Sequence, residues 1–150
     1  MLAIYKGREY CGRTIGDYRF ELRSKERIDD TFEYKKGVYI KTIYQSECDS
    51  IKNIYVYGVY NDEVIEIYRI NSNTNQFLVF SGSTFHYSEM FISEVLNGSE
   101  GKDIFAWCDT NVFKEFYIMI EEYPTHNNKQ KIFISLEQAK EYVSLLRLEG

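Results

Sequence analysis

The sequence has 150 residues, a mass of 17.8 kDa and a formal net charge of −5 at pH 7. Hydrophobic residues make up 44% of it, enough to fill the core of one ordinary domain or two very small ones. No apolar run approaches the roughly 20 residues of a membrane span, and residues 1–6 lack the basic head and apolar stretch of a signal peptide. We therefore expect a globular, cytoplasmic protein without a membrane partner.

The residue types favour a mainly β fold. The chain holds 14 Tyr, 10 Phe and one Trp but a single Pro, and aromatic and β-branched residues suit strands. A tyrosine buries its ring and keeps a hydroxyl for water or a partner, so an excess of Tyr also suits a contact surface. For any one tyrosine, lining a half-buried strand is the commoner role.

Residues 3–24 and residues 52–82 share one pattern. In the second stretch, Val56–Tyr60 and Val64–Ile70 flank Asn61-Asp62, a pair that predicts a two-residue hairpin loop. Residues 76–81 then predict a third antiparallel strand. The first stretch aligns with it at an offset of 55 over the hairpin and of 59 over the third strand. A true duplication and a chance similarity of short strands both explain this pattern.

Between these stretches, residues 31–34 and 38–44 are predicted strands joined by the turn Lys35-Lys36-Gly37. Residues 46–49 favour one short helical turn.

The second half of the chain is predicted to mix strands with two helices. A short helix is expected near 88–97, because Phe91, Ile92, Val95 and Leu96 have helical spacing. A C-terminal helix is expected over 136–148, preceded by a capping box of Ser135 and Gln138. Further strands are expected at residues 103–108, 112–121 and 131–134.

These elements predict a mainly β, α+β fold built from two related antiparallel β units. We expect a single compact domain over residues 1–150, with the repeat spanning 1–51 and 52–134 and the C-terminal helix in 135–150. Two small SH3-like barrels and one continuous sheet both fit this order of elements.

Negative charge is concentrated in the middle of the chain. Residues 28–127 hold sixteen acidic side chains against seven basic ones. A surface of this sign repels phosphate backbones and attracts basic proteins, which predicts a protein partner and no direct nucleic-acid binding. Solvation of strands and turns is the alternative role for these acids.

No catalytic, cofactor-binding or metal site is predicted. The three cysteines, Cys11, Cys48 and Cys108, are far apart in sequence and are expected to be buried free thiols. His86 lies near several hydroxyl residues, but no known catalytic motif accompanies it. His126 is expected to be an ordinary solvated loop residue.

Residues 1–82 contain, in this order, the segments IYKGREY, YRFEL, KKGVYIKTI, SECDSI, YVYGVYNDEVIEIYRI and QFLVFSG. This order resembles that of a group of small cytosolic immunity proteins of Gram-positive bacteria. Such proteins are encoded beside contact-dependent or secreted polymorphic toxins. The resemblance implies SH3-like β repeats and a protein that binds and blocks a toxin. Cys48 stands where the group has an aliphatic residue, and the tail after residue 98 is longer and less regular.

The composition and the resemblance together predict an immunity or antitoxin protein that neutralises a basic toxin, with a nuclease the expected kind. A phage or mobile-element protein that counters host defence by sequestering a nucleotide or a host protein is the alternative, and an enzyme ranks lowest. The surface predicted to bind the toxin consists of Tyr60, Asp62, Glu63, Glu66, Tyr68, Tyr87 and Glu89.

Overall fold

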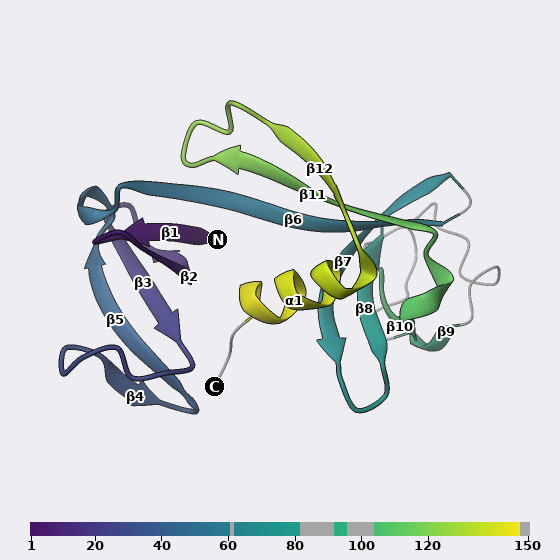
Figure 1. The fold of residues 1–150 in the computed structure, drawn as a ribbon, viewed down its shortest axis with the longest axis horizontal. Helices are drawn as coiled ribbons and strands as arrows, with labels where there is room; N and C mark the ends of the chain where they lie inside the picture. Colours follow the sequence, from purple (N-terminus) through teal and green to yellow (C-terminus); the bar gives the residue numbers. More distant parts are fainter. Residues whose placement is uncertain (61, 82–91, 96–103, 148–150) are drawn as a thin grey trace. The chain divides into compact units, whose positions relative to one another are not determined.

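The computed structural model describes residues 1–60, 62–81, 92–95 and 104–147 (Figure 1). The protein is mostly antiparallel β sheet with one C-terminal α-helix, so the coarse fold prediction is confirmed. Two compact units are present. The first contains residues 1–54, 120–130 and the chain from 145 onward, and the second contains residues 55–119 and 131–144.

In the first unit the strands lie in the order β4-β5-β3-β2-β1-β6. Every neighbouring pair is antiparallel. The strands are β1 (Leu2–Tyr5), β2 (Arg8–Ile15), β3 (Arg19–Ser24), β4 (Glu33–Lys35), β5 (Val38–Tyr44) and β6 (Ser50–Tyr60).

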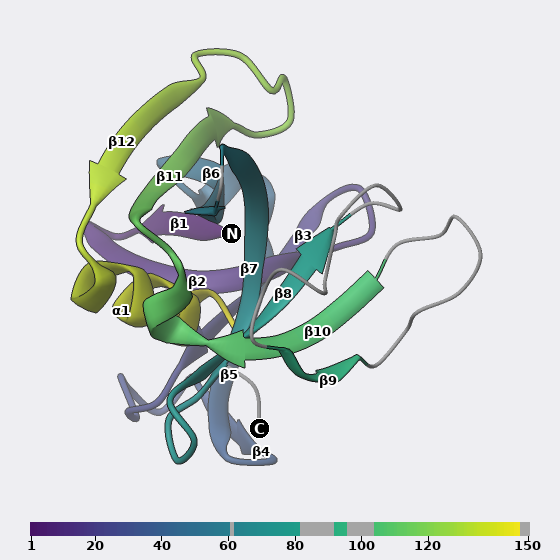
Figure 2. The same cartoon turned by 90° about the vertical axis from the view of Figure 1, so that its right-hand side faces the viewer.

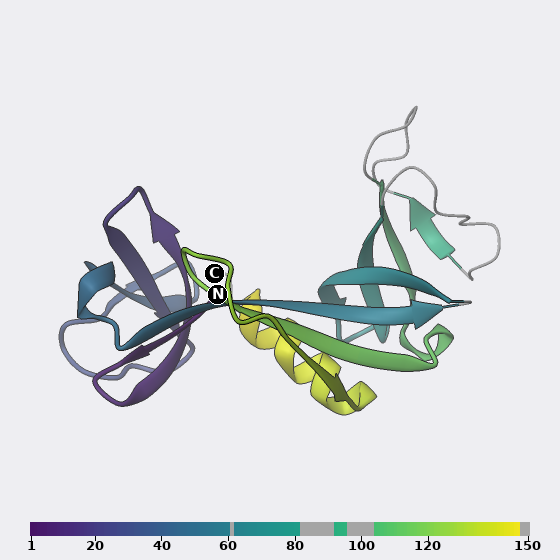
Figure 3. The same ribbon diagram turned by 90° about the horizontal axis from the view of Figure 1, so that it is seen from above.

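The second unit uses the far end of β6 as its first strand. Its order is β9-β10-β8-β7-β6, with β11 pairing with β6 and β12 pairing with β11. Figures 1 and 3 show β6 and β11 running side by side, as this pairing requires. The elements are β7 (Glu63–Asn71), β8 (Gln76–Ser81), β9 (Ile92–Val95), β10 (Ile104–Asp109), β11 (Glu115–Glu122), β12 (Gln130–Ile134) and α1 (Leu136–Leu146).

Strands β1 to β6, the first strand set, and strands β6 to β11, the second strand set, follow the same order of pairing. In each set three strands form a meander, the third pairs with the fifth, and the fifth pairs with the fourth. The sixth strand then returns to the first. A short 3-10 helix follows the fifth strand in both sets, at Gln45–Glu47 and at Thr110–Val112.

Matching backbone hydrogen bonds hold the 3-10 helices in place. Gln45 N–H donates to the carbonyl of Tyr18 at 2.7 Å, and Thr110 N–H donates to the carbonyl of Asn75 at 3.3 Å. Tyr18 and Asn75 each directly precede the third strand of their set. Each helix is therefore tied to the turn before that strand.

A second matching pair of backbone hydrogen bonds joins the residue before the sixth strand to the first strand. Asp49 N–H donates to Ile4 O at 2.7 Å, and Lys114 N–H donates to Val59 O at 3.1 Å. Ile4 and Val59 are separated by the offset of 55 that the sequence alignment predicts for the hairpins. The same offset relates the pair Tyr5 and Arg8 to Tyr60 and Glu63.

The third strands align differently from the prediction. Leu22 pairs with Gly12 and Val79 pairs with Ile67, so the offset for the third strand is 57 rather than 59. One of the two extra residues lies in a β-bulge between Ile67 and Arg69, and the other lengthens the following turn. A bulge leaves little trace in a sequence, because the residue pattern continues through it.

The corrected alignment places Phe20 on Phe77, and both side chains are fully buried. Phe20 belongs to the core of the first unit, where Tyr10 and Phe32 stack with ring centroids 5.8 Å apart. Phe77 packs against the rings of Phe113 and Phe116 in the second unit. Each strand set thus buries an aromatic ring of its third strand.

Neither strand set closes into a barrel among the described residues, where β4 and β9 each pair with one neighbour only. An SH3-like barrel therefore stays unconfirmed.

The helix expected near 88–97 is wrong over residues 92–95, which form β9. Ile92 and Val95 are β-branched, and β9 pairs with β10 through Val95 and Ala106. Strand pairing therefore outweighs the helical spacing of the apolar residues. The other residues of the expected helix lie outside the described ones.

The C-terminal helix is confirmed as α1, although it ends at Leu146. Ser135 N–H donates to Gln138 Oε1 at 2.9 Å and Gln138 N–H donates to Ser135 Oγ at 3.1 Å, which is the predicted capping box. Ala139 and Val143 are buried on one face. No helix among the described residues is long and apolar enough to cross a membrane.

Candidate binding surface

The loop of the β6–β7 hairpin presents two carboxylates. Tyr60 and Glu63 are the last paired residues, so the loop between them has two residues. Asp62 adopts the positive φ of 63° that such a loop requires. Asp62 and Glu63 are both exposed, so the tip of this hairpin is acidic.

Next to this tip, four side chains form a row across adjacent strands of the second unit. Glu66 of β7 lies opposite Tyr57 of β6. The Tyr57 ring stacks on Tyr117 of β11 at 5.2 Å, and Tyr117 meets Phe133 of β12 edge to face at 5.9 Å. We call these residues, Glu66, Tyr57, Tyr117 and Phe133, the four-strand row.

Lys131 covers the end of the four-strand row that lies on β11 and β12. Its ammonium group lies 4.2 Å from the ring centroid of Tyr117 and 5.1 Å from that of Phe133. A cation over an aromatic face is attracted by the ring quadrupole. Burial raises the pKa of the Tyr117 phenol, so this ring stays neutral beside the lysine at physiological pH.

Apolar surface remains exposed around the row. The Phe133 residue is 62% exposed and Val64, between Glu63 and Glu66, is 52% exposed. Large exposed apolar groups beside charged ones are typical of sites where proteins bind one another.

The structure distributes the predicted partner-binding residues over different places. Asp62 and Glu63 lie together at the tip, and Glu66 belongs to the four-strand row. Tyr60 shares its side of β6 with the buried Val56 and Gly58, and Glu63 lies directly opposite Tyr60, so both side chains start from the side of the sheet that faces away from Glu66.

The side chain of Tyr68 was predicted to share a face with Glu66 by simple alternation. Tyr68 lies inside the β-bulge, where alternation is interrupted, and the guanidinium of Arg69 lies 5.8 Å from its ring centroid. A basic group therefore accompanies this part of the acidic hairpin. Tyr87 and Glu89 lie outside the described residues.

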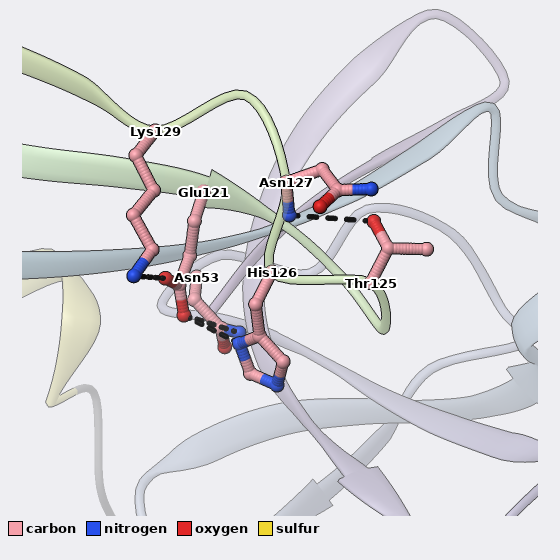
Figure 4. A network of polar contacts seen from close by, with 6 residues as sticks. All are labelled: Asn53, Glu121, Thr125, His126, Asn127 and Lys129. Atoms are coloured by element: carbon pink, nitrogen blue, oxygen red, sulfur yellow. Dashed lines mark hydrogen bonds and ion pairs between the residues drawn. The ribbon is translucent and has the colours of Figure 1, made fainter.

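A polar network in the first unit was missed by the sequence analysis. Glu121 of β11 is buried, and its Oε1 lies 2.7 Å from His126 Nδ1 and accepts a hydrogen bond from Asn53 Nδ2 at 3.4 Å (Figure 4). Lys129 Nζ lies 4.0 Å from the other oxygen. His126 was expected to be an ordinary loop residue, whereas it caps a buried carboxylate.

The network fixes the loop between β11 and β12. His126 has a positive φ of 57°, and its N–H donates to Glu122 O at 2.8 Å. Its side chain is 59% exposed, so the imidazole and carboxylate meet at the surface. Alternation places Glu121 on the side of β11 opposite Phe116 and Ile118, so the sequence pattern gave no signal of its burial.

Among the described residues, no group of three or more His, Cys, Asp or Glu side chains is placed to hold a metal ion. Cys11, Cys48 and Cys108 are free, and Cys11 and Cys108 are buried as expected, whereas Cys48 is only half-buried. Burial raises the pKa of Cys108 to about 12 and also raises the pKa of Cys11, so both thiols stay protonated.

The fold and this surface describe an antiparallel β protein with a C-terminal helix and an exposed surface of aromatic and acidic groups. The family described as uncharacterised conserved protein UCP033725 matches residues 1–92, more than half of the sequence. The chain belongs to this family. Searches of curated proteins and of solved structures gave no match.

Proposed function

We propose that this protein is an immunity or antitoxin protein that binds a cognate toxin and neutralises it. The proposal is supported chiefly by one observation, the acidic tip at Asp62 and Glu63 next to the four-strand row. Carboxylates attract a basic partner over a distance, and aromatic side chains then supply the contact area of a binding hot spot.

The expected partner is a basic protein such as a nuclease. A nuclease needs positive charge to hold phosphate groups, so an acidic inhibitor gains both association rate and specificity by matching that charge. Occluding the groove that holds nucleic acid would block the toxin.

The proposal is tested first by co-purification with the product of the adjacent upstream gene. Cells that express that gene should die without this protein and survive with it, and the two proteins should elute as one complex. Survival without this protein, together with no association, would exclude the proposal.

Charge reversal tests the surface itself. Glu63→Lys combined with Glu66→Lys should slow association at low salt by about tenfold or more and weaken its salt dependence, because long-range attraction is lost. Glu9→Lys combined with Glu26→Lys is the matched control, since both residues are exposed and belong to the first unit, Glu9 on β2 and Glu26 in the connector after β3. Stopped-flow measurements over a salt series would show the difference, and equal rates for both pairs would remove Glu63 and Glu66 from the interface.

A further inference from the structure

Strand β12 has an open edge. It pairs with β11 and with no other strand of the described residues. Figure 2 shows β12 at the margin of its part of the structure, with β11 on one side only. An unpaired edge offers a row of N–H and C=O groups to another strand.

Proteins usually protect such an edge with prolines, bulges or charged residues, and β12 has one such device, Lys131. It contains no Pro and runs Gln130-Lys-Ile-Phe-Ile134. A lysine pointing along the edge would discourage pairing, but Lys131 is directed onto the rings of Tyr117 and Phe133. Ile132 and Phe133, on opposite faces of the strand, are 40% and 62% exposed.

We infer that β12 pairs with β12 of a second copy of this chain, antiparallel and around a twofold axis. Residues directly opposite each other in an antiparallel pair point to the same side of the sheet. In a symmetric pair one residue must therefore lie opposite itself. Ile132 is the central residue of the strand, and a register centred on it pairs all five residues.

This register is complementary in charge and shape. It places Lys131 of each copy opposite Phe133 of the other, which extends the existing contact between an ammonium and aromatic rings. The two copies of Ile132 meet on the other face. A register centred on Lys131 would oppose two like charges, and one centred on Phe133 would leave both Gln130 and Lys131 without a strand partner.

The dimer is expected to depend on concentration. Five paired residues per chain bury less than the roughly 1,200–2,000 Å² of a standard stable interface. Sedimentation velocity over a concentration series should show a reversible monomer–dimer equilibrium. Ile132→Lys should shift this equilibrium to monomer, because it places two lysines opposite each other at the axis.

Cysteine cross-linking tests the register. In a Cys48→Ser background, Ile132→Cys should link to itself on oxidation or with a short bismaleimide. Lys131→Cys and Phe133→Cys should link to each other when mixed, more strongly than either links to itself. Val64→Cys is the matched control, since Val64 is exposed but lies on β7, which has a neighbour on both sides.

Two results would overturn the inference. The first is a protein that stays monomeric at every concentration, with Ile132→Cys linking no faster than Val64→Cys. The second is protection of the β12 amides from hydrogen exchange only when a different protein is added, which would assign the edge to a heterologous strand.

Discussion

Thr110 stands out at the scale of single residues, because it is buried at the start of a 3-10 helix with an unsatisfied hydroxyl. Its side chain is nearly inaccessible, and its Oγ1 has no hydrogen-bond partner in the part of the chain that the structure describes. Its backbone N–H, by contrast, donates to Asn75. The backbone of Thr110 therefore contributes a hydrogen bond to the fold, whereas its hydroxyl group contributes none.

Replacing the hydroxyl with a methyl group should stabilise the protein. Thr110→Val keeps the shape of the side chain and removes a buried polar group without a partner, so the free energy of unfolding should rise by about 1 kcal/mol. Thr110→Ser is the control, since it keeps the hydroxyl and loses the methyl group, and it should destabilise. Urea denaturation measures both changes. A loss of stability in Thr110→Val would mean that the hydroxyl has a partner.

Residue-scale features of the site were partly predictable. The acids of the hairpin tip follow directly from Asp62 and Glu63 next to a predicted two-residue loop. Tyr117 and Phe133 could not be predicted as part of the same row, because their proximity to Tyr57 depends on strand pairing between residues about 60 apart or more in sequence. The partner of His126 was hidden for a related reason, since it depends on a loop turning back onto its own strand.

At the scale of elements, the first strand of each set, β1 or β6, packs beside a residue that follows the 3-10 helix of that set. The two sets place the larger side chain at opposite positions of this pair. Gly58 of β6 leaves space for the ring of Phe113, because a Cβ atom there would lie 2.5 Å from a ring carbon. The corresponding residues in the first strand set are the buried Ala3 and the smaller Cys48. A larger residue on the strand is thus matched by a smaller one after the 3-10 helix.

The competition for space between Gly58 and Phe113 can be measured as a coupling free energy. Gly58→Ala should lower the free energy of unfolding by about 1–3 kcal/mol, because the added methyl overpacks the site. In a Phe113→Cys background the same change should be smaller, since the ring has been removed. A double-mutant cycle in guanidinium gives the coupling. Additive effects would show that the two residues do not compete for space.

Elements were predicted best where local chemistry decides them. The hairpin loops, the turn at Lys36-Gly37 and the capping box of α1 all follow from short-range residue preferences. Strand β9 was predicted incorrectly, because its conformation depends on pairing with β10 and its apolar spacing fits a helix equally well. The bulge in β7 was missed for the same reason.

At the scale of the whole molecule, the compact units do not coincide with the repeat in the sequence. Residues 120–130 belong to the first unit although they follow the second strand set in the chain. There Tyr123 N–H donates to Ile51 O at 3.1 Å, and Glu121 accepts from Asn53. The first strand set therefore receives stabilising contacts from the β11–β12 hairpin.

A fragment cut at the end of the first strand set should not fold on its own. Residues 1–60 lack the contacts of residues 120–130, so far-UV circular dichroism should show no cooperative urea transition. The control is the same fragment joined to residues 115–134 by a flexible Gly/Ser linker, which should restore cooperativity. Cooperative unfolding of residues 1–60 alone would contradict this expectation.

The double use of β6 limits how such a chain can grow. Because one strand ends the first set and begins the second, each added copy in a tandem array requires five new strands instead of six. Strand β11 occupies the place from which a third copy would start. Here β11 continues instead into β12, which pairs with β11 alone, and into helix α1, so the five-strand addition is not repeated among the described residues that follow.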